Sequence, residues 1–245
     1  MKTHYLSGDT LKISMQANRR ARLDGANYSP GARLVGIASS VMVVLLGVAY
    51  GGALSVGVLS VKDSQEPLGD PFFSLIEFLI MVLSLLMVLV MAVIHAWALP
   101  DQKSNSHVSL LFMSLLAGLT CCVHFAILLI SRQIVTPDMP WPTIAYATDV
   151  LAWDGFFSLS ALFAAPLFRG DRLRNSIRFL LIASGILSII GMIGLPFDHM
   201  PLRMIGLFGH AVFFPVAVIL LAVLFYRSPA LVEGEGLLPC RSEET

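Results

Sequence analysis

Charged residues are scarce in this sequence. Asp, Glu, Lys and Arg make up 13% of its 245 residues, whereas a soluble domain has roughly 25%. Hydrophobic residues reach 56%, and the mean hydropathy is +0.80. A soluble fold of this length could not bury so much apolar surface, so the composition predicts that a lipid bilayer surrounds much of the chain.

An excess of charge of one sign is also lacking. Sixteen basic and sixteen acidic residues give a net charge of zero, so no basic surface for nucleic acid is expected. Cys121 and Cys122 are neighbours in an apolar run and Cys240 lies in a polar tail, which gives no disulfide framework, and no CxxC spacing indicates zinc. We therefore expect no nucleic-acid partner and no cofactor, while metal binding stays open.

Long apolar runs are what the sequence does contain. Each has about the 20 residues that a helix needs to cross a bilayer, and short polar segments connect them. The runs cover residues 34–61, 71–99, 108–134, 143–168, 177–195 and 201–226. The predicted fold is an all-α, polytopic bundle of six transmembrane helices over residues 34–227, between a polar tail at 1–33 and a short tail at 228–245.

Lys and Arg are distributed unevenly between the ends of these runs. Thirteen of them lie in the two tails and in the segments around 100–107 and 168–178, whereas only Lys62, Arg132 and Arg203 lie in the other three loops. Short loops rich in Lys and Arg remain on the cytoplasmic side. The bias therefore predicts that both termini are cytoplasmic, and that the protein is a multi-pass protein of the cytoplasmic (inner) membrane.

Small residues and one proline predict features of the packing. Gly47, Gly51 and Ser55 recur every fourth residue in the first run, a spacing that lets helices approach closely. We interpret this stripe as a helix contact that could also form a homo-oligomer. Pro215 lies inside the sixth run, where it should kink the helix and free a carbonyl that another group must satisfy.

Polar groups inside the apolar runs are the candidate functional residues. Asp154 lies near the middle of the fourth run, where an ionised carboxylate costs at least about 2.5–3.5 kcal/mol. Such a group normally faces the bundle interior or a water-filled cavity and has a partner. His124, Asp149 and His210 all fall roughly 9–14 Å below the predicted outer boundary, at 1.5 Å per residue. They would converge if their three helices are neighbours.

Two further spacings bear on these groups. Asp149 and Asp154 are five residues apart, which on a regular α-helix points them about 140° from each other, so they should not form one tight carboxylate pair. In the second run, Glu77 and His95 lie five helical turns apart on one face with Met, Ser and Val between them. We weigh a functional role for both against simple boundary residues, and we interpret the methionines as core rather than as metal ligands.

Part of the chain resembles a group of membrane proteins. The residues concerned are Trp153-Asp154-Gly155-Phe156-Phe157 through Leu162-Phe163-Ala164-Ala165-Pro166, and Arg203-Met204-Ile205-Gly206 to Phe225-Tyr226-Arg227. Over the C-terminal 90 or so residues they are similar to uncharacterised multi-span membrane proteins of bacteria and archaea. The resemblance implies a prokaryotic type of inner-membrane protein, and it implies no activity and no site residue.

Three functions agree with these observations. In a small transporter, permease or proton-linked protein, Asp154, Asp149, His124 and His210 would line a path for a small solute or a proton. The alternative is a non-catalytic sensor or assembly protein, in which the same groups only hold the bundle together. A membrane-embedded metal-dependent hydrolase, with two histidines and an aspartate as zinc ligands, ranks third, so the sequence favours a role other than catalysis.

Overall fold

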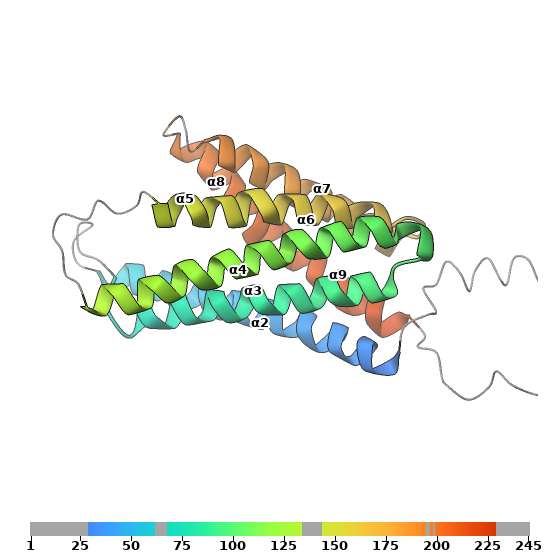
Figure 1. Ribbon diagram of the computed structural model, residues 1–245, viewed down its shortest axis with the longest axis horizontal. Coiled ribbons are helices and arrows are strands. Elements are labelled where there is room, and N and C mark those ends of the chain that lie inside the picture. Colours follow the sequence, from blue (N-terminus) through green and yellow to red (C-terminus); the bar gives the residue numbers. More distant parts are fainter. Residues whose placement is uncertain (1–28, 62–67, 134–143, 195–196, 198, 229–245) are drawn as a thin grey trace, which may run out of the picture.

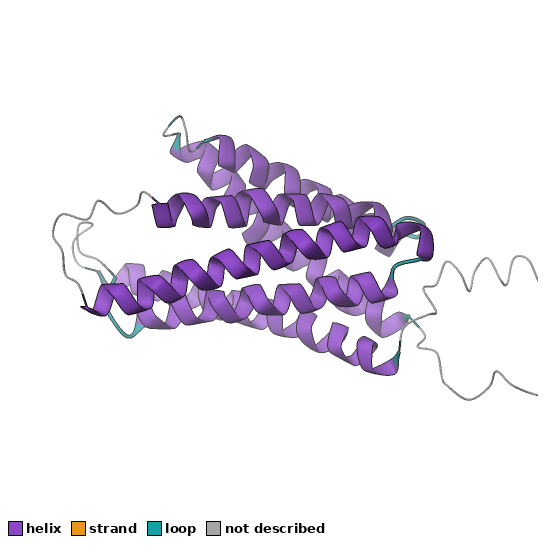
Figure 2. Ribbon diagram, viewed as in Figure 1, coloured by secondary structure: helices purple, strands orange, loops and turns teal. Residues whose placement is uncertain are grey.

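A computed structural model describes residues 29–61, 68–133, 144–194, 197 and 199–228. All regular secondary structure in this part of the chain is helical (Figure 2). Six of its helical segments are long and apolar enough to cross a membrane. The predicted all-α bundle with six spans is therefore confirmed.

Four spans are continuous α-helices and two are interrupted. The continuous ones are α2 (Pro30–Ser60), α3 (Phe72–Trp97), α4 (Lys103–Gln133, preceded by the 3-10 turn η1, Pro100–Gln102) and α7 (Arg172–Ile193). The fourth span consists of α5 (Ile144–Val150), the π-helical segment η2 (Leu151–Phe156), α6 (Phe157–Ala164) and the 3-10 turn η3 (Ala165–Leu167). The sixth consists of α8 (Met200–Phe208), the π-helical segment η4 (Gly209–Phe213) and α9 (Phe214–Arg227).

Local capping fixes where two of these helices begin. The side chain of Ser29 accepts a hydrogen bond from the Ala32 N–H at 3.2 Å, and Pro30 occupies the first helical position, where its missing N–H costs nothing. The first span therefore begins four residues before the expected position 34. Asp171 caps α7 in the same way, accepting from the Arg174 N–H at 2.8 Å.

The six spans run lengthwise along the molecule (Figure 1). Each packs against its neighbours in sequence, and the contacts form a closed ring. The ring closes where α2 packs against α9. Here the guanidinium of Arg33 donates to the carbonyls of Phe225 and Tyr226, and Gly36 lies against Phe225. We call this end of the bundle, where α2 begins and α9 ends, the terminal end, and the opposite end the distal end.

The fourth span is the most enclosed of the six. In its most apolar stretch of 18 residues, 67% of the residues are buried, whereas the corresponding fractions in the other spans are 11–44%. The fourth span is therefore covered by other helices over most of its surface. Its Phe157 packs edge to face on Phe214 of α9, with ring centroids 4.9 Å apart. Ser160 and Ser109 of α4 exchange hydrogen bonds between hydroxyl and carbonyl, both 2.8 Å long. The core therefore surrounds the segment that holds Asp154.

Close helix approach occurs at glycines of the fifth and sixth spans rather than at those of the first. A Cβ on Gly191 would lie 2.4 Å from the Cα of Gly206, so α7 and α8 are in backbone contact. Gly47 and Gly51 would each have open space around a Cβ. The prediction of a helix contact at Gly47, Gly51 and Ser55 is thus wrong within the described part of the chain, because none of its helices lies close against the two glycines. A homo-oligomer through this stripe stays a prediction.

Candidate functional site

Three ionisable side chains from three helices form a buried triad. The Nδ1 atom of His124 in α4 lies 2.5 Å from Oε2 of Glu77 in α3, and its Nε2 atom lies 3.2 Å from Oδ1 of Asp149 in α5. His124 and Glu77 are buried, whereas 31% of the Asp149 side chain is exposed. The imidazole is therefore held between two carboxylates, only one of which remains accessible.

The arrangement lets this triad exchange one proton. A ring nitrogen donates to a carboxylate only when it has a hydrogen, so between two ionised carboxylates an imidazolium donates to both and a neutral ring donates to one. With both carboxylates ionised, the triad has one net negative charge with an imidazolium and two with a neutral imidazole. A cation that binds Asp149 therefore competes with the proton on His124.

A second cluster surrounds Asp154 in η2. The guanidinium of Arg203 in α8 donates to Oδ2 of Asp154, and Nδ1 of His210 in η4 lies 3.6 Å from Oδ1, beyond hydrogen-bonding distance. The Arg203 guanidinium also lies over the Tyr146 ring, 5.2 Å from its centroid. Asp154 is only 1% exposed, and within the described residues its Oδ1 atom has no hydrogen-bond partner.

Asp154 and His210 both lie in π-helical segments, η2 and η4. In η2 the Phe157 N–H bonds to the Ala152 carbonyl, and in η4 the Phe214 N–H bonds to the Gly209 carbonyl, each five residues back. The second segment ends just before Pro215, and the Ser184 hydroxyl gives the Gly209 carbonyl a further hydrogen bond at 2.6 Å. Such wide turns are frequent at functional sites. A π-helical segment thus adjoins Pro215, whereas the predicted kink stays a prediction.

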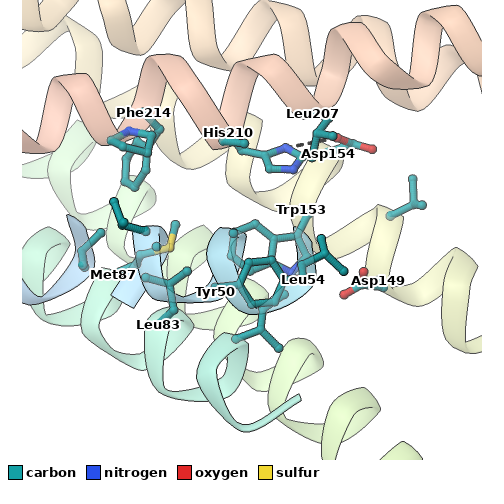
Figure 3. Close-up of a pocket in the computed structure, with 18 of the residues that line it drawn as sticks. Tyr50, Leu54, Leu83, Met87, Asp149, Trp153, Asp154, Leu207, His210 and Phe214 are labelled. Carbon is teal, nitrogen blue, oxygen red and sulfur yellow. Dashed lines mark ion pairs between the residues drawn. The ribbon is translucent and has the colours of Figure 1, made fainter. Parts of the chain in front are cut away.

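A cavity of about 620 Å³ connects the two clusters. It lies between α2, α3, the α5–η2 segment and the α8–η4 segment, towards the distal end (Figure 3). Its polar wall consists of Tyr50, Tyr146, Asp149, Trp153, Asp154, Arg203 and His210. Its apolar wall includes Val43, Leu83, Met87 and Phe214, and three of these are almost fully buried, so the cavity ends in the packed core.

The structure answers whether His124, Asp149 and His210 converge. His124 and Asp149 do meet, but His210 lies with Asp154, because the sixth span neighbours the fifth and first rather than the third. Asp149 and Asp154 line one cavity, and their carboxylates make different contacts, with His124 and with Arg203. The angle of about 140° expected between them assumed a regular α-helix, and η2 is not one.

The face of the second span that holds Glu77 and His95 packs on α4. Glu77 contacts His124, whereas Nδ1 of His95 lies 2.9 Å from the hydroxyl of Ser106 near the terminal end. Met91, between them, is fully buried and accepts from the Ser109 hydroxyl. His95 is thus separate from the cavity, and the interpretation of this methionine as core is confirmed.

Sequence reasoning did not include Arg203, Tyr50, Tyr146 or Trp153 among the site residues. Arg203 was recognised as a loop cation on the helical face of His210, seven residues later, but it was not assigned to the site. In the described ranges no group of three or more His, Cys, Asp or Glu side chains is arranged to hold a metal ion. Cys121 is half-buried and Cys122 exposed, and Cys240 lies outside the described residues.

Comparison of the chain with protein-family models, with curated proteins and with solved structures finds no match. The functional argument therefore depends on the geometry of the cavity and of its two charged clusters.

Proposed function

We propose that this protein is a proton-linked carrier of a small solute in the cytoplasmic membrane. One observation supports the proposal most directly. Asp149 both lines the cavity and contacts His124, so a single carboxylate is shared between the space for a solute and a group that can hold a proton. Binding in the cavity and protonation of the triad are then linked, and linkage acts equally in both directions.

The sign of this linkage follows from the charges. A cation near Asp149 provides the positive charge that the imidazolium of His124 otherwise provides, so its arrival favours proton release. An anion or neutral solute gives no such exchange. The mechanism is therefore an exchange of a cation for a proton, with both termini on the cytoplasmic side as the distribution of Lys and Arg predicts.

Proteoliposomes with a trapped pH-sensitive dye test this function. The panel consists of quaternary ammonium, carboxylate and neutral solutes, with protein-free liposomes as the blank. We expect the quaternary ammonium solute to change the internal pH, the carboxylate and neutral solutes not to change it, and His124→Gln to abolish the change. His95→Gln is the matched control, because His95 is a histidine of the same bundle that lies outside the cavity. Absence of a solute-dependent pH change in the wild type would contradict the proposal.

A ligand-binding membrane sensor is the second candidate. The observation in its favour is the closed terminal side of the cavity, where Met87 and Phe214 are 1% and 2% exposed. A sensor would bind the same solutes without moving them. Binding to the purified protein combined with absence of flux in proteoliposomes would therefore select the sensor.

A further inference from the structure

We propose that the cavity binds an amphipathic amine, with its ammonium group at Asp149 and its apolar body against α2 and α3. The inference names the solute class of the proposed function and rests on that function for transport, but not for binding. The charges, the unpartnered polar atoms and the opening of the cavity each support it.

The charges on the cavity wall leave a place for one cation. Among the described residues that line the cavity, Asp149 and Asp154 oppose one guanidinium, that of Arg203, which already donates to Asp154. The Asp149 carboxylate is in contact with His124 at 3.2 Å through one of its oxygens. Since Glu77 adds a further negative charge behind His124, the polar wall favours a positively charged ligand group.

Buried polar atoms without partners on the cavity wall indicate that the charged group of the ligand also forms hydrogen bonds. Oδ1 of Asp154, Nδ1 of His210 and Nε1 of Trp153 have no hydrogen-bond partner among the described residues. All three residues line the cavity, and Asp154 is 1% exposed. Burying such atoms unpaired costs about 1–3 kcal/mol each. A ligand N–H group can relieve this cost at the acceptor Oδ1 of Asp154, whereas the Trp153 N–H is a donor and an ammonium group leaves it unpaired. Figure 3 shows Trp153 between the Asp154–His210 pair and Tyr50, where its face can also contact a cation.

The cavity is open towards the lipid-facing surface between α2 and α8. α2 packs extensively against α9 but not against α8. On either side of the gap, Leu54, Met204 and Leu207 line the cavity and are 36–45% exposed. Gly51 lines it too and has open space where a side chain would be. A molecule with an apolar body, dissolved in the bilayer, therefore has a route to the polar wall.

Three probes with one shape and different charge test the ligand class. They are 1-adamantylamine, 1-adamantanol and adamantane-1-carboxylate, measured by calorimetry on the full chain in nanodiscs with empty nanodiscs as the blank. We expect the amine to bind at least about tenfold more tightly than the alcohol, and the carboxylate to bind most weakly. Asp149→Asn should remove the preference for the amine, whereas Asp101→Asn, at an exposed residue outside the cavity, should keep it.

A glycine pair tests the position of the apolar body. Gly51→Leu places a side chain in the cavity and should weaken amine binding at least about tenfold. Gly52→Leu is the matched control, because Gly52 is exposed, has the same open space around a Cβ and does not line the cavity. If Gly51→Leu does not fold, Gly47→Leu replaces it, since Gly47 lines the same cavity.

The outcomes separate this inference from the proposed function. Equal affinities for amine and alcohol, or equal effects of the two leucine variants, would overturn the inference even if another solute moves protons. Amine binding that depends on Asp149 and Gly51, without proton movement in proteoliposomes, would support the inference and overturn the carrier.

Discussion

The ion pair between Arg203 and Asp154 gives an asymmetric stability prediction. Arg203→Met leaves the Asp154 carboxylate with no cationic hydrogen-bond donor in a site that is 1% exposed. Removing one partner of a buried ion pair costs about 3–5 kcal/mol, and we expect a decrease of that size in the free energy of unfolding. The cost is high because the remaining charge cannot reach water.

The reverse change should be milder. In Asp154→Asn the remaining charge belongs to Arg203, whose side chain is 23% exposed and lies over Tyr146. The amide can still accept a hydrogen bond, so we expect a loss of about 1–2 kcal/mol. The double variant removes both charges and should be no less stable than Asp154→Asn, which means that the two single effects do not add.

The measurement is unfolding by SDS in mixed micelles, followed by far-UV circular dichroism, for the wild type, both single variants and the double variant. Arg172→Met is the control, because Arg172 is an exposed arginine at the start of α7. Equal losses in the two single variants, or a double variant whose loss equals their sum, would refute the reasoning from burial. In that case the pair would behave like a solvated surface contact.

Three other predictions concern packing, topology and cysteine chemistry. Gly191→Ala should destabilise the protein by about 1–3 kcal/mol in the same unfolding assay, because its Cβ would meet the backbone of Gly206 at 2.4 Å, whereas Gly118→Ala, with open space, should not. Reporter fusions should give cytoplasmic signals after Arg20, Ser104, Asp171 and Glu235. They should give external signals at Ser64, Asp138 and Asp198. Two or more reversed signals would contradict the topology. The intact monomer should migrate identically on reducing and non-reducing gels, and a shift would show an internal disulfide.

The six spans could be predicted because apolar length is a local property of the sequence. Most boundaries agree to within about two residues, whereas the first, third and fifth spans begin about four to five residues before the predicted positions. The first does so because the cap at Ser29 and Pro30 starts the helix inside the polar tail. The interior position of Asp154 could be predicted equally well, because depth along a spanning helix follows from counting residues at 1.5 Å each. These are statements about single helices and their solvent.

The pairing of helices could not be predicted, because lipid-facing and helix-facing apolar surfaces have similar compositions. Gly51 and Gly191 illustrate the difficulty: both are glycines in apolar helices, yet one lines a cavity and the other contacts a backbone. The sequence could not show that Arg203 is the partner of Asp154 for the same reason. Arg203 shares a face with His210, but only the contact between the fourth and sixth spans shows what that face meets.

The closure of the ring by Arg33 has a consequence for the time course of synthesis. The carbonyl of Phe225 that Arg33 binds lies 192 residues later in the chain, so a ribosome that adds 5–20 residues per second makes it roughly 10–40 s after the arginine. The partner of Asp154 is only 49 residues away and follows within roughly 2–10 s. Asp154 thus lacks its partner for a shorter time than Arg33 does, but both partners belong to the sixth span, so neither contact can form before that span is being made.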